Sequence, residues 1–461
     1  MCFNCSYHIQ DSNRYFNDAP SSMHSWKIYA TDIFDQTTDR TEENCNVLQV
    51  IYDPQNYGAG QSIGDIDLRL GKLNISENVQ MHKIRQVFHD DKLHLLPADL
   101  TGPSRKLYVV ITDKNNDFLA CAKIRHLETK VAKTLINSKG IKGELTLMQR
   151  SIFEPTFLNF TFKTTDGSLK SDFEFAKNIA SYKIHELPPS PIYESESQYC
   201  DTAGEIFNPR EIDQKNIPPP GYGTQDQYAI GDLSGKLTGR NKNEQHDFII
   251  EDGTNELNGI YWDIFAPLFG RHSIVYRGFS INQRQDNATG SPIGCSFFAL
   301  YDSNQRYQVQ MQTAQVLFRY PIVGKIIFRQ RFEQPWHDTT VIVEYLIHAD
   351  GSNVNNTENH KWSIHVHQPD KDFYSWQNRC ISTGDVINTN KVSFDSKAPE
   401  NTCSPESSYL CRLGDLSRLG SLSIAGSIKN ANKFTRKIFT DSNLPLSGFS
   451  NIMGKSVTIF D

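Results

Sequence analysis

The chain of 461 residues lacks long hydrophobic runs, a large charge of one sign and the common catalytic signatures. No apolar stretch reaches the roughly 18–20 residues that a membrane helix needs, so we expect no membrane span. The net charge is only −6, which favours neither a nucleic-acid partner nor an anionic lipid surface. Gly-x-Ser-x-Gly, His-Glu-x-x-His and a Walker-type phosphate loop are all missing, so these hydrolase and nucleotide-binding chemistries have no support.

The first residues also lack the basic and apolar regions of a signal peptide, which fits a cytosolic protein, a mature chain or an interior fragment. Among the cysteines, only Cys2 and Cys5 have the Cys-x-x-Cys spacing, and without a second such pair a zinc ribbon is not indicated. Nine cysteines, regularly placed, and five glycosylation sequons together favour a secreted glycoprotein. The sequons begin at Asn4, Asn74, Asn159, Asn287 and Asn355.

The chain instead contains the residues that form β-strands. Aromatic residues make up 11%, and Thr, Val and Ile are frequent. Strand-sized apolar runs are broken by Gly, Pro, Asn and Asp, and no long stretch has helical periodicity. This pattern predicts an all-β protein of antiparallel barrels or sandwiches.

A Gly-Asp motif in an apolar setting recurs three times, in SIGDIDLRLGKL (62–73), AIGDLSGKLTG (229–239) and RLGDLSRLGSL (412–422). Before each motif lie an alternating strand and then a cysteine. The motifs are 167 and 183 residues apart, which is far too long for a solenoid repeat of about 20–50 residues. Each copy is therefore expected to be a domain, with boundaries at 1–127, 128–308 and 309–461. The second and third copies also share an entry strand, at 132–149 and 314–330.

The second repeat resembles a Cu/Zn superoxide dismutase domain along nearly its whole length. The matching segments are YKIHELP (182–188), CDTAGEIFNP (200–209), GDLSGK (231–236), APLFGRHSIVYRGFSI (266–281) and IGCSFFAL (293–300). The series is most similar to the extracellular copper-only superoxide-dismutase-repeat proteins, which string such barrels together. This resemblance implies three tandem Greek-key β-barrels or sandwiches, with the first incomplete at its start and the third lacking its last strand.

In that family four histidines bind copper, two of them from a His-x-His on one strand. Carried over in order, the four positions fall on Lys27, Tyr29, Ile51 and Val110 in the first repeat, Lys183, His185, Ile206 and Asn282 in the second, and His365, His367, Val386 and Phe460 in the third. Zero, one and two ligands are thus retained. Aliphatic side chains have no lone pair for a metal, so we expect these positions to have become core.

The leading functional hypothesis is a non-enzymatic secreted structural or interaction protein without a cofactor, and in its sharper form a subunit of an extracellular filament or matrix. A copper-binding protein or residual dismutase using His365 and His367 is the alternative. A soluble module that binds a ligand with its barrel loops is a third hypothesis. The aspartates of the Gly-Asp motifs, Asp65, Asp232 and Asp415, are expected to cap turns.

The resemblance also implies disulfides Cys45–Cys121 and Cys200–Cys295. Cys403 and Cys411 are eight residues apart and are expected to pair locally, which leaves Cys2, Cys5 and Cys380. Two explanations remain open: the chain is part of a longer array, or molecules assemble head to tail. In the second, the segment FNCSYHIQ (3–10), which resembles IGCSFFALYD (293–302), completes the third barrel of another molecule, and Cys5 or Cys2 bonds Cys380.

Overall fold

The computed structural model has a mostly β fold of several antiparallel sheets with few, short helices. The described residues are 21–31, 45, 48, 50–58, 60–75, 87–93, 106–113, 115–125, 127–138, 141–164, 179–190, 196–237, 249–250, 256–285, 288–349, 355–370, 372, 379–389, 403, 411–427, 434–448 and 450–461. The described residues divide between Leu127 and Glu128 into two compact units, and the second unit holds both later repeats. Each unit is described by itself.

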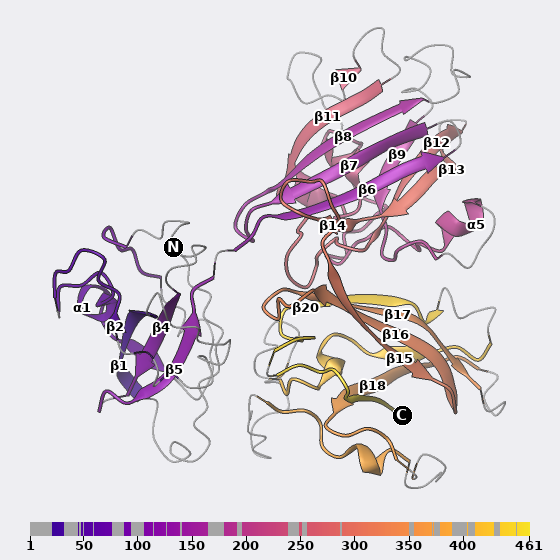
Figure 1. Cartoon of the computed structure of the whole chain (residues 1–461). Coiled ribbons are helices and arrows are strands. Elements are labelled where there is room, and N and C mark those ends of the chain that lie inside the picture. Colours follow the sequence, from indigo (N-terminus) through magenta and orange to yellow (C-terminus); the bar gives the residue numbers. More distant parts are fainter. Residues whose placement is uncertain are drawn as a thin grey trace. The chain divides into compact units, whose positions relative to one another are not determined.

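The first unit is a small antiparallel sheet of order β2-β1-β4-β5, with β3 also paired to β1 (Figure 1). Its elements are β1 (Ser21–Ala30), β2 (Val50–Ile51), α1 (Ile66–Leu70), β3 (Leu73–Ile75), β4 (Leu107–Thr112) and β5 (Phe118–Lys123). Trp26 and Ile28 alternate along β1 and are buried with Leu107, as the period of two in a strand requires.

The second repeat is a sandwich of a six-stranded sheet, β10-β11-β8-β7-β6-β14, and a three-stranded sheet, β13-β12-β9 (Figure 1). The strands are β6 (Lys130–Ser138), β7 (Ile141–Gln149), β8 (Thr156–Thr164), β9 (Ile179–Ile184), β10 (Ile249–Ile250), β11 (Glu256–Asp263), β12 (Gly278–Gln285), β13 (Ala288–Phe297) and β14 (Ala299–Tyr301), with helices α5 (Glu196–Asp201), η2 (Gln225–Gln227) and α6 (Leu233–Leu237). Phe162 of one sheet stacks on Phe279 of the other, with ring centroids 6.2 Å apart. Their burial joins the two layers into one core.

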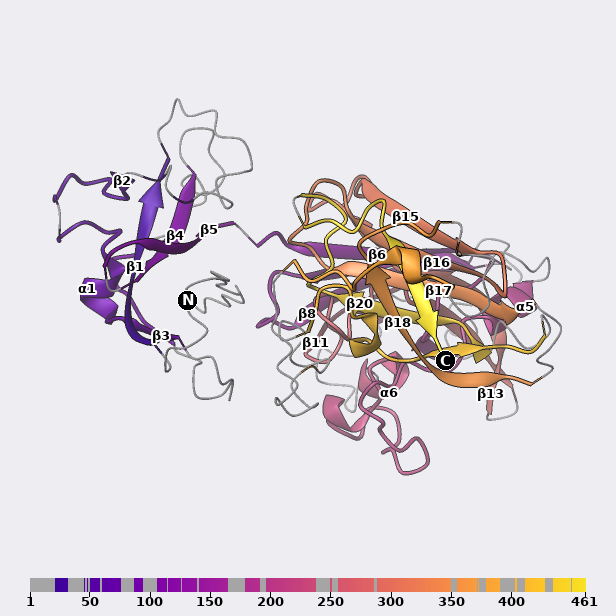
Figure 2. The ribbon, with the colours of Figure 1, turned by 90° about the horizontal axis from the view of Figure 1, so that it is seen from below.

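The third repeat is built in the same way, from the sheets β15-β16-β17-β20 and β19-β18-β21. Figure 2 labels β15, β16, β17 and β20 of the first sheet and β18 of the second. Its elements are β15 (Met311–Phe318), β16 (Ile322–Arg331), β17 (Thr339–His348), β18 (Thr357–His365), η4 (Ile381–Thr383), η6 (Leu416–Arg418), β19 (Leu422–Ile424), β20 (Lys437–Asp441) and β21 (Ser456–Phe460). Phe328 and Val341 from one layer share a core with Trp362 and Ile364 from the other. Within the described part of the chain, none of these sheets closes into a barrel.

The Gly-Asp motif closes the same backbone clasp in all three repeats. A strand residue donates its N–H to the glycine carbonyl, the glycine donates to a residue after the cysteine loop, and that residue donates back to the strand carbonyl. The three members are Ile28, Gly64 and Tyr52; Ile184, Gly231 and Phe207; and Ile364, Gly414 and Ile387, with N···O distances of 2.7–2.9 Å. Such a cycle leaves no room for a side chain, which explains why glycine recurs there. The internal repeat seen in the sequence is therefore also a repeat in three dimensions.

The two repeats of the second unit share a buried contact. Ile342 and Ile438 of the third repeat belong to the core of the second. Beside them, Lys130 Nζ lies 2.6 Å from Asp338 Oδ2 and donates to the Leu268 carbonyl at 3.1 Å. The two repeats of the second unit are thus joined by apolar contacts and by a buried ion pair.

Acid is expected to weaken this contact through His337. Burial, followed by the charges of Arg331 and Lys130, lowers the pKa of His337 to about 4, and Arg331 Nη1 lies 3.4 Å from His337 Nε2. Because the folded pKa is below the unfolded one, the unfolded chain binds the extra proton as the pH falls from about 6.5 to about 4, and stability falls over this window. The free energy of unfolding, measured with urea, should fall between pH 7 and pH 4.5. The fall should be smaller by about 2 kcal/mol in His337→Gln than in the parent protein. Equal decreases in both proteins would contradict this role.

Candidate functional site

Two of the histidines retained from the implied copper site, His185 and His365, make hydrogen bonds within their own repeats. His185 Nδ1 lies 2.9 Å from the Gly204 carbonyl and Nε2 lies 2.8 Å from Ser280 Oγ. His365 contacts the Gly384 carbonyl at 2.6 Å and Ser363 Oγ at 2.9 Å. In each repeat the histidine thus ties its strand to a glycine 19 residues further on, with both ring nitrogens engaged.

The structure corrects the assignment of His365 and His367 as the His-x-His pair of the third repeat. The clasp aligns Ile364 with Ile184 and with Ile28, so His365 corresponds to His185 and to Tyr29. The aligned pair in the third repeat is therefore Ser363 and His365, and His367 lies beyond it. The His-x-His spacing suggested a pair two residues too far along the strand. The backbone hydrogen bonds, and not the spacing of the histidines, set the register of this strand.

The position of the fourth implied copper ligand also needs a correction. Lys27, Lys183 and Ser363 are equivalent on their strands, and the residues opposite them are Val110, Ser280 and Thr458. Asn282 and Phe460, which we expected there, lie two residues further along their strands. The position of the third implied ligand needs no correction, because the three repeats agree there. The residues at that position lie opposite the second member of the aligned pair: Ile51 opposite Tyr29, Ile206 opposite His185 and Val386 opposite His365.

The expectation that these positions have all become core is wrong. Val110 is fully buried, but Ile51, Ile206 and Val386 are half-buried and Phe460 is exposed. The alternation of side chains explains the difference, because the next residues, such as Phe207 and Ile387, point into the core instead. The described residues contain no group of three or more His, Cys, Asp or Glu side chains placed to hold a metal ion. Among the aligned ligand positions in the described residues, the second and third repeats each retain a single imidazole, His185 and His365, and the first retains none.

The aspartates of the three motifs accept hydrogen bonds from backbone amides of nearby residues. Asp65 accepts from the Gly60 amide at 2.9 Å and from Ser62 Oγ at 2.6 Å, and also from Lys27 Nζ of β1 at 2.7 Å. Burial alone would raise the pKa of Asp65, but these hydrogen bonds outweigh it and hold the pKa below its usual value. Asp232 accepts from the Gly235 amide at 2.8 Å, and Asp415 from the Ser417 amide at 3.1 Å. The expected turn role is confirmed.

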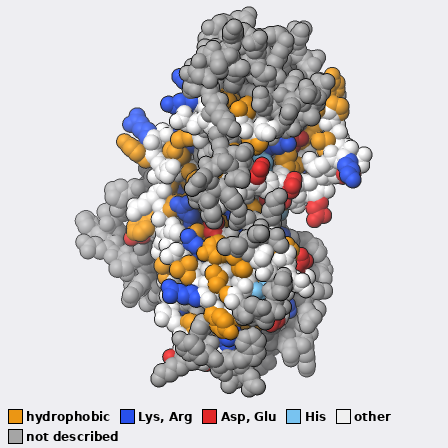
Figure 3. Space-filling view, turned by 90° about the vertical axis from the view of Figure 1, so that its right-hand side faces the viewer, with side chains coloured by type: hydrophobic (Ala, Val, Ile, Leu, Met, Phe, Trp, Pro, Cys, Tyr) orange, Lys and Arg blue, Asp and Glu red, His pale blue; other side chains and the backbone are white. Residues whose placement is uncertain are grey.

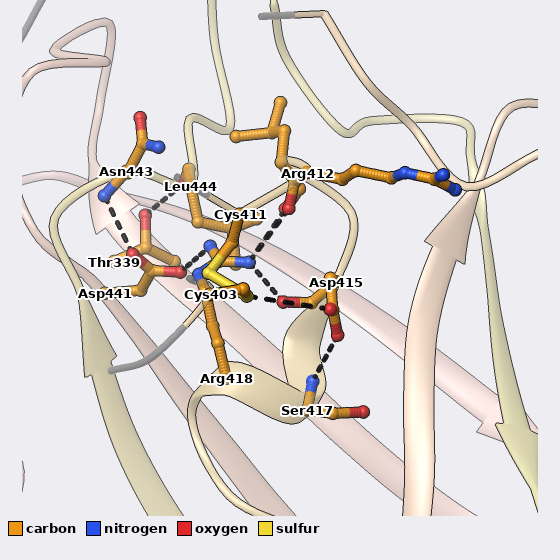
Figure 4. A network of polar contacts seen from close by, with 11 residues as sticks. Thr339, Cys403, Cys411, Arg412, Asp415, Ser417, Arg418, Asp441, Asn443 and Leu444 are labelled. Atoms are coloured by element: carbon orange, nitrogen blue, oxygen red, sulfur yellow. Dashed lines mark hydrogen bonds and ion pairs between the residues drawn. A yellow bond between two sulfur atoms is a disulfide. The ribbon is translucent and has the colours of Figure 1, made fainter. Parts of the chain in front are cut away.

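A cation after each Gly-Asp completes a polar network that we did not anticipate from the sequence. The cations are Arg69, Lys236 and Arg418, and each pairs with an aspartate from a distant segment: Asp90, Asp263 and Asp441. Each also donates to carbonyl groups of the Gly-Asp turn. Figure 4 shows Arg418 between Asp441 and the turn of the third repeat. In the sequence, a basic residue four or five positions after the motif glycine was the one sign of this network. Its aspartate partners are too distant in the sequence to be identified without the structure.

The structure contains the three expected disulfides, Cys45–Cys121, Cys200–Cys295 and Cys403–Cys411. Cys380 is the free cysteine of the described residues and is half-buried. Like Cys200, it lies 15 residues after the aligned histidine of its repeat. Burial and the nearby Asp372 raise the pKa of the Cys380 thiol. Its position therefore corresponds to a disulfide position whose partner strand is not among the described residues.

Other predicted modification sites are only partly visible. Asn159 and Asn355 are exposed, as an acceptor of a glycan must be. Asn74 lies on β3, but its side chain is outside the described residues. Cys2, Cys5, Asn4 and Asn287 also lie outside the described residues.

The third repeat has two sheet edges that are covered in the second. In the second repeat, β13 pairs with β12, and β14 pairs with β6. In the third, β21 and β15 are the outermost strands of their sheets among the described residues. Their sequences, SVTIF and MQTAQVLF, contain no charge and no proline, which are the usual protections of a strand edge. On the face shown in Figure 3, hydrophobic side chains lie between scattered charges of both signs.

No family model matches this chain, and no curated protein matches it either. No helix of the described residues is long and apolar enough to cross a membrane.

Proposed function

We propose that this protein is a non-enzymatic, secreted structural or interaction protein built of three degenerate superoxide-dismutase-like Greek-key domains. The main support is that His185 and His365 use both ring nitrogens within their own repeats. A copper ion that changes oxidation state needs several available imidazoles. Three disulfides, which persist in oxidising compartments, support an extracellular location.

Two strand edges that no described strand covers favour association over ligand binding by loops. β15 and β21 present backbone groups and uncharged side chains at the outside of the third repeat. Such edges are templates for another strand. A subunit of an extracellular filament or matrix uses such surfaces, and a head-to-tail contact between copies would extend without closing.

Metal analysis tests the proposal against the copper-binding alternative. After incubation with Cu²⁺ and dialysis, the copper content of the His365→Ala/His367→Ala variant should equal that of the parent protein. His348→Ala, which removes a histidine outside the aligned positions, is the matched control. Superoxide dismutation should not exceed that of buffer. Stoichiometric copper that only the double variant loses, or activity that depends on this copper, would overturn the proposal.

Light scattering tests self-association. At rising protein concentration it should show masses above that of the monomer.

A further inference from the structure

The outer face of the larger sheet in the second repeat carries exposed apolar side chains. Ile260 and Trp262 of β11 point away from the core, because Tyr261 between them is buried in it. Ile264 follows directly after the strand. The three apolar residues Ile260, Trp262 and Ile264 are 59%, 57% and 64% exposed. Apolar side chains that gather on the outside of a domain indicate a surface that is covered by another group.

The neighbouring strand places a glycosylation sequon on the same face. Figure 1 shows β8 beside β11, and in this pair Asn159 lies opposite Ile260 while Phe157 lies opposite Trp262. The ring centroids of Phe157 and Trp262 are 5.1 Å apart. Thr161, the third residue of the sequon, is exposed on the same side as Asn159. The acceptor amide thus has an apolar side chain across the ladder and an aromatic ring two residues before it on its own strand.

We propose that Asn159 carries an N-linked glycan whose first sugar, N-acetylglucosamine, packs against Ile260 and the ring pair of Phe157 and Trp262. One face of this sugar presents C–H groups, which the negative face of an aromatic ring attracts. Opposite residues of a ladder have Cβ atoms about 4.5–5.5 Å apart and diagonal neighbours about 7–8 Å, so the sugar lies within reach of these side chains. This inference rests on the extracellular location in the proposed function and names what covers the apolar face.

The modification consumes an oligosaccharide that is linked to a lipid through a diphosphate. Nδ2 of Asn159 attacks the anomeric carbon C1 of the first sugar, the bond between C1 and the diphosphate oxygen breaks, and the lipid diphosphate leaves. The new bond between C1 and Nδ2 replaces one N–H bond of the amide, and the proton passes to a base. No oxidation or reduction takes place. Thr161 completes the Asn-x-Thr sequence that this transfer requires.

The sequon of Asn355 supplies a matched control in the same unit. Asn355 is also exposed, but it precedes β18 and its sequon neighbours make polar contacts. Thr357 Oγ1 lies 2.8 Å from His348 Nε2 and 2.7 Å from His360 Nε2. Asn356 Oδ1 accepts the Gly426 amide at 3.0 Å. A sugar on Asn355 is therefore expected to add little to the stability of the fold.

Removal of each sugar tests the packing. The full chain is produced behind a signal peptide in animal cells, and mass spectrometry measures the sugar on Asn159 and Asn355. Asn159→Gln should raise the equilibrium constant of unfolding in urea about fivefold, whereas Asn355→Gln should leave it unchanged. In Trp262→Ala, which lacks the indole ring, Asn159→Gln should have little further effect. An effect of Asn159→Gln no larger than that of Asn355→Gln, or undiminished in Trp262→Ala, would overturn the inference.

A nuclear magnetic resonance signal separates packing from a general effect of glycosylation. The glycans are labelled with ¹³C and trimmed enzymatically to one N-acetylglucosamine each. The sugar C–H signals that disappear in Asn159→Gln should lie upfield of those that disappear in Asn355→Gln, because aromatic rings shield the protons above them. These signals should move downfield in Trp262→Ala. Coincident signals from the two sugars would exclude stacking.

The remaining outcomes separate this inference from the proposed function. Absence of sugar from Asn159 would overturn the inference, and sugar on Asn355 in the same sample would show that the proposed location still stands. If Asn159 is bare and Trp262→Ala lowers the mass found by light scattering, the apolar face joins copies of the chain instead. Functional copper in the parent protein would refute the proposed function and leave the packing of the sugar unaffected.

Discussion

Replacing Asp263 with alanine is expected to lower the free energy of unfolding of the second unit by about 3–5 kcal/mol. The side chains of Asp263 and Lys236 are both 0% exposed and form an ion pair. Asp263 Oδ1 also accepts the Phe265 amide at 2.8 Å, and Lys236 Nζ donates to the Ile230 carbonyl at 2.8 Å. Removing the carboxylate leaves a buried ammonium without its counter-charge. Urea unfolding followed by circular dichroism measures the loss.

An ion pair with one exposed partner supplies the control for this prediction. Lys133 and Glu144 lie 3.3 Å apart, and the glutamate is 45% exposed, so Glu144→Ala should cost less than about 1 kcal/mol. The double variant Lys236→Met/Asp263→Leu removes both charges and should recover most of the lost stability. A loss in Asp263→Ala no larger than that in Glu144→Ala would show that the network around the Gly-Asp turn does not stabilise the repeat.

Replacing Gly231 with alanine is expected to cost about 3–6 kcal/mol, because the new methyl group collides with the backbone clasp. A Cβ at this position would lie 2.1 Å from the Ile184 carbonyl oxygen and 2.8 Å from the Phe207 nitrogen. Neither atom belongs to a flexible side chain, so the strand and the loop must separate and lose their mutual hydrogen bonds. Amide hydrogen exchange at Ile184 and Phe207 should increase together with the loss in urea stability.

Gly270→Ala is the matched control for the clasp. Gly270 has φ of +76°, but a Cβ there meets nothing within 4 Å, so only the backbone conformation opposes the change, at about 1–2 kcal/mol. If Gly231→Ala yields no soluble protein while Gly270→Ala is produced in normal yield, the expected destabilisation is also confirmed. Equal urea midpoints for the two variants would contradict a role of the clasp in folding.

Local patterns were sufficient to predict some of the site but not its register. The Gly-Asp motif identified the three turns, because a glycine without room for a side chain and a capping aspartate are both local requirements. The pair His365 and His367 was misassigned, because two histidines two residues apart match the His-x-His spacing. Only the hydrogen bonds of Ile364 define which strand residues are equivalent to those of the other repeats. Likewise, Phe460 lies opposite Lys361, and no spacing along the chain states this.

A β-rich chain with an internal repeat could be predicted from the sequence alone, because composition, alternation and recurring motifs are properties of neighbouring residues. The disulfides Cys45–Cys121 and Cys200–Cys295 followed only from the family resemblance. Only the tertiary structure showed that the ring nitrogens of His185 and His365 are engaged in hydrogen bonds, that Lys236 pairs with Asp263, and that β21 is an outermost strand of its sheet among the described residues. Several of these contacts join segments that are distant in the sequence, such as His185 with Ser280 and Lys236 with Asp263, where the free energy of packing and hydrogen bonding, and not local preference, selects the partner.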